Sequence, residues 1–187
     1  RQATGSDLRA ILDEAKAKMS PEENTSAIFS DEKTNLPNRK AFNAAQEALA
    51  RSHPHVGFAD IDGFKDVNTQ LGEPTVDKTI FPAIGEAMRN AAAKENGAVH
   101  VFHVHGDEFQ FLGSDPDAIS RVVDSVNKEL AGAKFTVKNA DGSISEVKGV
   151  GFSHGTGETL EAASAAEQLN KQARKAAGLR TGARDAP

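Results

Sequence analysis

Two short acidic turns hold the side chains of this sequence that are best suited to chemistry. Asp60 and Asp62 flank a single isoleucine, and Asp107 is followed directly by Glu108. Carboxylates within a few ångströms of one another repel, and each raises the pKa of the other. A divalent cation relieves that repulsion, and Mg²⁺ prefers one or two carboxylates together with phosphate oxygens and water. If the two turns converge, they predict a metal-dependent phosphate site for an in-line displacement.

Either turn alone has a simpler interpretation. An acidic pair at the end of a strand or at a hairpin tip is usually a solvated turn, because Asp favours turns for its local hydrogen bonding. Lys65 and Asn68 follow the first turn closely. A cation and an amide beside two sets of carboxylates favour a phosphate site over two unrelated turns.

Strand periodicity precedes both acidic turns. Residues 55–61 (HVGFADI) read as one strand, and residues 99–104 and 109–112 read as the two arms of a hairpin. Asp107 and Glu108 then lie at the hairpin tip. In a βαββαβ arrangement the first strand pairs with the second arm of such a hairpin. We therefore expect the carboxylates to meet at one end of an antiparallel sheet.

The remaining segments complete an α+β fold. Apolar residues at helical spacing predict helices over residues 6–19, after Pro37, and over residues 75–94, 116–131 and 158–177. Ser6 or Asp7 is expected to cap the first helix, and Asn38 the second. Pro82 must kink the helix of residues 75–94 or delay its start.

A further hairpin is expected at the sheet edge. Residues 140–143 (ADGS) have turn chemistry, and they separate strand-like residues 135–137 from residues 147–152. The fold class is thus α+β, a central antiparallel-rich sheet with a βαββαβ core and helices packed around it. This order places the helices on one face.

Composition narrows the possible functions. The chain has 187 residues, no Cys and a net charge of -5. A cytoplasmic protein fits the absence of Cys, and no apolar run approaches the roughly 18 residues of a membrane span. The acidic balance argues against a nucleic-acid-binding surface. The first residue is Arg1, so we interpret the sequence as a fragment.

Four motifs in order resemble those of the GGDEF (diguanylate cyclase) family, a family of bacterial signalling enzymes. Residues 31–42 (DEKTNLPNRKAF) resemble its opening D-x-LTGLPNRRAF, and residues 59–68 (ADIDGFKDVN) resemble LDIDxFKxIN. Leu71, Gly72 and Asp77 match part of YGHxxGD, and residues 105–109 (HGDEF) match the signature itself. Residues 149–155 and 165–178 resemble the closing segments less well. The resemblance implies a nucleotidyl-cyclase-like, palm-type catalytic domain over residues 31–180, after an N-terminal helix and linker (1–30) and before a tail (181–187).

The resemblance also implies a metal site. Asp60 and Asp107 would ligate Mg²⁺ (or Mn²⁺) through their side chains, and the Ile61 carbonyl would assist. Glu108 would lie beside the ribose 3′-hydroxyl and the metal, where it would help to activate that oxygen as the nucleophile. Asp62 would instead be structural, with a local hydrogen-bonding role.

Substrate contacts are implied in the same way. Phe64 and Lys65 would lie at the triphosphate, and Asn68 and Asp77 would read the guanine edge. Arg174, or Lys175 because the spacing differs by one residue, would close over the phosphates. The substrate-binding residues implied by the resemblance are Phe64, Lys65, Asn68, Asp77, His105, Gly106 and Arg174, and the catalytic ones are Glu108, Asp107 and Lys65.

Several positions depart from the family pattern. His105 replaces the first Gly of the signature, where Gly allows close approach of the backbone and positive φ. Glu73 and Val76 replace the His and second Gly of YGHxxGD, and His103 replaces an Arg. The inhibitory RxxD motif falls on residues 96–99 and is absent. These changes spare the expected metal ligands and guanine readers.

The expected function is that of a diguanylate cyclase, which condenses two GTP molecules to cyclic di-GMP and releases pyrophosphate. Such an enzyme would act as a transient homodimer and be controlled by a fused or partner regulatory domain. One alternative is a catalytically inactive module that binds GTP or a cyclic dinucleotide. Another is a different nucleotidyl transfer on the same palm-like sheet.

Overall fold

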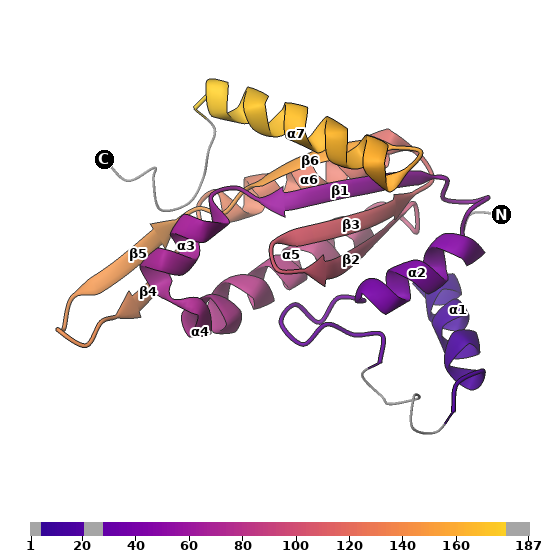
Figure 1. Cartoon of the computed structure of the whole chain (residues 1–187), viewed down its shortest axis with the longest axis horizontal. Coiled ribbons are helices and arrows are strands. Elements are labelled where there is room, and N and C mark those ends of the chain that lie inside the picture. The colour runs from indigo at the N-terminus through magenta and orange to yellow at the C-terminus, as the bar shows by residue number, and fades with distance from the viewer. Residues whose placement is uncertain (1–4, 21–27, 179–187) are drawn as a thin grey trace.

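The computed structural model describes residues 5–20 and 28–178, with side chains from Leu8 onward (Figure 1). The predicted cap at Ser6 or Asp7, most of the expected linker and the expected tail of residues 181–187 lie outside this description. Within the described ranges, no helix is long and apolar enough to cross a membrane.

A four-stranded antiparallel sheet forms the centre of the fold. Its strands lie in the order β2-β3-β1-β6. They are β1 (His55–Ile61), β2 (Val99–His105), β3 (Glu108–Gly113) and β6 (Phe152–Gly157). β1 pairs with β3, so the first strand is next to the second arm of the hairpin, as predicted.

Eight helical segments accompany the sheet in the described part of the chain. They are α1 (Gly5–Ala17), α2 (Arg39–Ala48), α3 (Phe64–Leu71), α4 (Glu73–Thr75), the π-helical turn η1 (Val76–Ile80), α5 (Phe81–Ala93), α6 (Pro116–Leu130) and α7 (Leu160–Ala176). Asn38 caps α2 by accepting from the Ala41 N–H, as predicted.

Helices cover both faces of the sheet, so the expectation of helices on one face is wrong. Adjacent residues of a strand point to opposite faces, and Phe58 and Ala59 of β1 belong to two different cores. Ala59 packs in the core that α5 and α6 build, whereas Phe58 packs with α1, α2 and α7. The sheet is therefore the middle layer of three.

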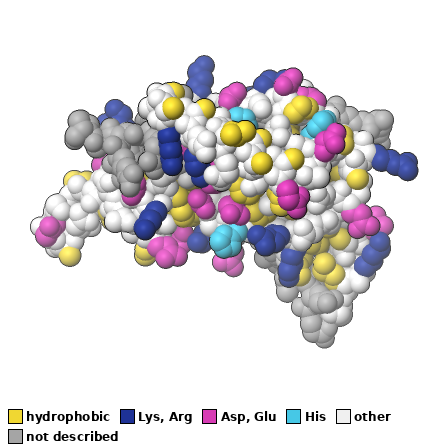
Figure 2. All heavy atoms as spheres, turned by 45° about the horizontal axis from the view of Figure 1, so that its top comes forward, with side chains coloured by type: hydrophobic (Ala, Val, Ile, Leu, Met, Phe, Trp, Pro, Cys, Tyr) yellow, Lys and Arg dark blue, Asp and Glu magenta, His cyan; other side chains and the backbone are white. Residues whose placement is uncertain are grey.

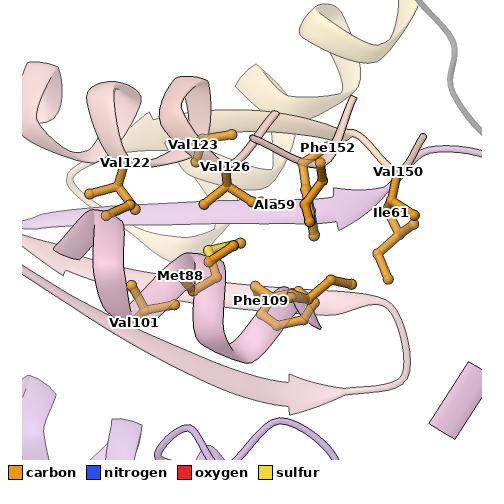
Figure 3. Close-up of a cluster of buried hydrophobic side chains, with 14 of the residues drawn as sticks. Ala59, Ile61, Met88, Val101, Phe109, Val122, Val123, Val126, Val150 and Phe152 are labelled. Atoms are coloured by element: carbon orange, nitrogen blue, oxygen red, sulfur yellow. The ribbon is translucent and has the colours of Figure 1, made fainter. Parts of the chain in front are cut away.

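The core beneath α6 follows from the spacing of its valines. Val122, Val123 and Val126 are buried, and Figure 3 shows them above Ala59 of β1. Met88 of α5 lies in the same cluster (Figure 3). The 3.6-residue period that predicted this helix thus correctly identified its buried side.

The predicted helix of residues 75–94 is interrupted at its start. It comprises α4, a π-helical turn over Val76–Ile80, and α5. Pro82 has no backbone N–H to donate to residue 78, and the Phe81 N–H donates to the Val76 carbonyl, five residues back. The proline therefore changes the helical register rather than ending the helix.

The strand expected over residues 147–152 is two strands in different sheets. β4 (Lys134–Lys138) and β5 (Ile144–Lys148) form a separate two-stranded sheet. Gly149 has a φ of 78°, a conformation that favours Gly, and turns the chain after β5. β6 then begins at Phe152 and joins the main sheet beside β1.

Candidate active site

The two acidic turns meet at one end of the sheet, as the strand order requires. Asp60 on β1 is the register partner of Glu108 on β3. The Ile61 N–H donates to the Asp107 carbonyl at 3.1 Å. This bond ties the hairpin tip to the end of β1 and brings the carboxylates of Asp60 and Asp107 into one site.

The electrostatics of this site show that the carboxylates interact. Burial raises the pKa of Asp107, and the carboxylates of Asp60 and Glu108 raise it further. Asp60 Oδ1 is buried and has no hydrogen-bond partner in the described part of the chain. A buried, unsatisfied carboxylate oxygen is costly unless a ligand satisfies it.

The oxygen atoms of these residues suit a divalent cation whose remaining ligands come from a substrate and from water. In residues 5–20 and 28–178, no group of three or more His, Cys, Asp or Glu side chains is arranged to hold a metal. Mg²⁺ is ordinarily bound by one or two carboxylates plus phosphate oxygens and water. Asp60 and Asp107, with the Ile61 carbonyl, would supply that smaller set.

A cavity of 780 Å³ opens beside the carboxylates. Its lining residues are Ile61, Gly63, Phe64, Lys65, Asp66, Asn68, Thr69, Glu73, Asp107 and Lys171. Gly63 has a φ of 64° at the start of α3 and offers no side chain to cap it. The first turn of a helix presents free N–H groups and a positive dipole end, which suit phosphate. The cavity thus combines a helix N-terminus with Lys65 and a carboxylate.

α3 itself was not predicted from the sequence, although it carries three of the predicted site residues. Phe64, Lys65 and Asn68 all lie on it. Asn68 Oδ1 is buried without a hydrogen-bond partner in the described chain. Asp77 lies on the π-helical turn, where its Oδ1 is 3.1 Å from Lys33 Nζ. Asp77 is not among the residues that line the cavity.

The cations of α7 contact the acidic turn at the end of β1. Arg174 Nε lies 2.9 Å from Asp62 Oδ2, and the Ser153 hydroxyl donates to Asp62 Oδ1. Asp62 is only 4% exposed, which agrees with a structural role, but its hydrogen bonds reach β6 and α7 and are not local. Lys171, which was not predicted, lies 2.6 Å from Asp60 Oδ2.

Acidic and basic side chains are intermixed on the face of the molecule that Figure 2 shows.

Glu167 is a second functional candidate that sequence reasoning missed. Its side chain is fully buried one turn before Lys171. Burial, followed by the interaction with the neighbouring Asp60 carboxylate, raises its pKa to about 7. A signal was present, because a lone Glu on the inner side of an Ala-rich helix is unusual unless it is paired.

Comparison with known proteins identifies the family. The family model described as "Diguanylate cyclase, GGDEF domain" matches residues 28–179. This chain belongs to the GGDEF domain family. No curated protein matches the chain.

Solved GGDEF domains share the fold. The GGDEF domain of FimX from Pseudomonas aeruginosa has a TM-score of 0.62 at 12% identity, covering 78% of this chain and 94% of that one. The GGDEF domain of DgcB from Caulobacter crescentus, solved in complex with c-di-GMP, has a TM-score of 0.59 at 21% identity, covering 80% and 89%. SiaD from P. aeruginosa, in complex with its activator SiaC, has a TM-score of 0.58 at 23% identity, covering 90% and 68%.

The GGDEF signature hairpin accommodates His105 without backbone strain. In the described chain, positive φ outside Gly occurs only at Asn35 and Asn96. The tight turn instead falls on Gly106, which has a φ of 47°. His105 ends β2 opposite Glu108 and is exposed. The backbone at the first signature position therefore tolerates a residue other than Gly. Only the bulk of the imidazole side chain could interfere with the site.

His103 joins the opening motif of the GGDEF domain to its signature turn. Its Nδ1 lies 2.7 Å from Asp31 Oδ2, and its Nε2 lies 2.7 Å from the Gly106 carbonyl. The ring stacks on Phe109 at 4.6 Å. Both partners are hydrogen-bond acceptors, one at each nitrogen of the ring. His103 thus holds the hairpin tip against residues 31–37.

Asp31→Asn should lower the free energy of unfolding by about 2 kcal/mol at pH 7. Burial alone would raise the pKa of Asp31, but hydrogen bonds from His103 and Thr34 outweigh it and lower the pKa from 3.8 to about 2. The folded pKa is below the unfolded one, so this stability is present above pH 3.8 and is lost as the pH falls through 2. Urea unfolding at pH 7, 4 and 3 tests this.

Glu32→Gln is the matched control for this experiment, because Glu32 is adjacent and exposed. It should leave the unfolding free energy within about 0.5 kcal/mol of that of the unmodified chain. A loss in Asp31→Asn that stays constant from pH 7 to pH 3 would contradict the ionic origin of the effect.

Proposed function

We propose that this GGDEF domain binds GTP with Mg²⁺ or Mn²⁺ and acts as a diguanylate cyclase. The observation that carries the proposal is the convergence of Asp60, Asp107 and Glu108 beside a cavity that Lys65 and the N-terminus of α3 also line. Asp60 does not stabilise the fold by its position, because one of its carboxylate oxygens is buried without a hydrogen-bond partner in the described chain. Their arrangement suits a substrate that brings both phosphate and a cation.

The proposed reaction joins two nucleotides. The 3′-hydroxyl oxygen of one GTP forms a bond to the α-phosphorus of the other, and the bond to pyrophosphate breaks. Glu108 would accept the proton of the hydroxyl. Asp60, Asp107 and the Ile61 carbonyl would hold Mg²⁺ or Mn²⁺, which neutralises charge on the reacting phosphate. A second, equivalent bond closes the ring of cyclic di-GMP.

Further residues would bind and orient GTP. Lys65 would contact phosphate as a point charge, near Phe64 and the first turn of α3. Asn68 and Asp77 would read the guanine edge, because a carboxylate accepts from the N1–H and the amino group of guanine. Asp77 must then share its carboxylate with Lys33, which lies 3.1 Å away. Arg174 would reach phosphate only by leaving Asp62.

Two copies of the domain are needed, because each would hold one of the two GTP molecules. The pairing would be transient. Fused or bound regulators are a natural means of control, since DgcB is known with a coiled coil and SiaD with an activator protein. α1 packs against α2, and it would connect the domain to such a segment.

Product analysis tests the cyclase proposal. The protein is incubated at high concentration with GTP and Mg²⁺ or Mn²⁺, and the products are identified by mass spectrometry. Cyclic di-GMP and pyrophosphate are expected. If calorimetry shows GTP binding but no cyclic dinucleotide forms, the cyclase proposal fails, and the alternative of an inactive nucleotide-binding module replaces it. That alternative is favoured by one observation, the cation of Lys171 already seated on Asp60.

His105→Gly and His105→Ala should both raise cyclase turnover by at least about threefold, because small misplacements of reacting groups are costly. At position 105 the family has Gly, whose side chain is a single hydrogen atom. The imidazole of His105 would therefore crowd the nucleotide. His105 does not have a positive φ, so Ala should serve as well as Gly. Initial rates of pyrophosphate release measure the effect. Unchanged or lower rates in both variants would show that His105 does not obstruct the site.

A further inference from the structure

Lys171 occupies an unusual place on α7. Its Nζ lies 2.6 Å from Asp60 Oδ2 and 3.4 Å from Glu167 Oε1. The side chain is 26% exposed, and it also lines the cavity beside Asp107. Lys171 therefore directly contacts a proposed metal ligand, Asp60, which precedes it by 111 residues in the chain.

The charges around Lys171 hold it in the ammonium form. Burial lowers its pKa, but the hydrogen bond to Asp60 and the carboxylates of Asp60 and Glu167 reverse this, and the pKa is raised. The ammonium engages only one oxygen of Asp60, since the other oxygen has no hydrogen-bond partner in the described chain. A cation therefore already compensates the carboxylate that the proposed function assigns to a metal.

We propose that Lys171 is a resident counter-cation of Asp60, which competes with a divalent metal for that carboxylate. This inference rests on the proposed function, in which Asp60 holds the metal. Two cations cannot share one carboxylate without repulsion. A metal that arrives alone therefore competes with Lys171 and binds weakly.

A metal that arrives with GTP does not meet the same resistance. The triphosphate brings several negative charges into the cavity that Lys171 already lines, so the displaced ammonium gains a new anionic partner there. Lysine suits this exchange, because it is a compact charge on a flexible stem. Arg174, one turn later, is instead paired with the buried Asp62. Lys171 thus makes metal binding depend on nucleotide.

Titration of Mn²⁺ into the nucleotide-free protein, followed by electron paramagnetic resonance, tests the proposal. Lys171→Met keeps an unbranched side chain of similar length and removes the charge. It should tighten Mn²⁺ binding by at least about tenfold, given the strength of a close ion pair. Lys171→Arg should stay within about twofold of the unmodified protein, because it keeps the cation. Lys128→Met, on the exposed side of α6, controls for the change in net charge.

Unchanged or weaker Mn²⁺ binding in Lys171→Met would overturn the proposal. It would also be overturned if the gain persisted in the double variant with Asp60→Asn, because the additional Mn²⁺ would then not be bound at Asp60. Thermal unfolding of each variant verifies that the fold is intact, and Lys171→Arg tests the charge independently. Calorimetry of the unmodified protein with GTP and Mg²⁺ separates the two proposals. A lack of GTP binding contradicts the proposed function, whereas an unchanged Mn²⁺ affinity contradicts only the role of Lys171.

Discussion

Asp107→Asn is expected to reduce cyclase turnover by at least about 100-fold, since even outer partners of metal ligands typically contribute 10- to 100-fold. Asp107 lies at the hairpin tip, where the Ile61 N–H fixes its backbone at 3.1 Å. The amide keeps the shape and loses the charge that a divalent cation requires. Mn²⁺ binding in the presence of GTP should weaken together with turnover. Initial rates and Mn²⁺ titration measure the two effects.

The same substitution should not harm folding. Burial and the neighbouring Asp60 carboxylate raise the pKa of Asp107, so its charged form is disfavoured in the folded state without metal. Removing the charge should therefore leave the melting temperature unchanged or raise it at pH 7, a common trade-off at functional sites. Asp124→Asn, an exposed change on α6, should alter neither property. Full turnover in Asp107→Asn would show that the metal site is assigned wrongly.

Gly155→Ala is expected to destabilise the domain by about 3 kcal/mol, the upper range for overpacking a core. A Cβ on Gly155 would lie 2.2 Å from the Glu167 backbone nitrogen and 2.4 Å from the Ala163 carbonyl oxygen. These atoms belong to the backbone of α7, so no side-chain rotation can relieve the overlap. α7 would have to move away from β6 as a unit.

Thermal unfolding measures this loss, and a fall of roughly 6–12 °C is expected for a chain of this size. Gly132→Ala is the matched control, because a Cβ there would meet no atom within 4 Å. The displacement of α7 should also separate Lys171 from Asp60 and Arg174 from Asp62. Equal melting temperatures for the two Ala variants would show that α7 is not packed tightly on Gly155.

Most of the local elements, and the chemistry of the two acidic turns, could be predicted from the amino-acid sequence. The valines of α6 recur at helical spacing, and residues 55–61 match β1 from end to end. Because β1 and the signature hairpin have an order typical of one topology, the meeting of Asp60 with Asp107 and Glu108 could also be predicted. Short-range periodicity and strand order carry this information.

Tertiary structure decided which side chains complete the site. α3 was missed because its eight residues have too little apolar repeat, and β6 was missed because Gly149 and Gly151 interrupt the pattern before it. Lys171 reaches Asp60 across 111 residues, a contact that no local pattern contains. It exists because α7 lies directly on Gly155, and a helix that is packed on a strand brings whichever side chains it carries to the end of that strand.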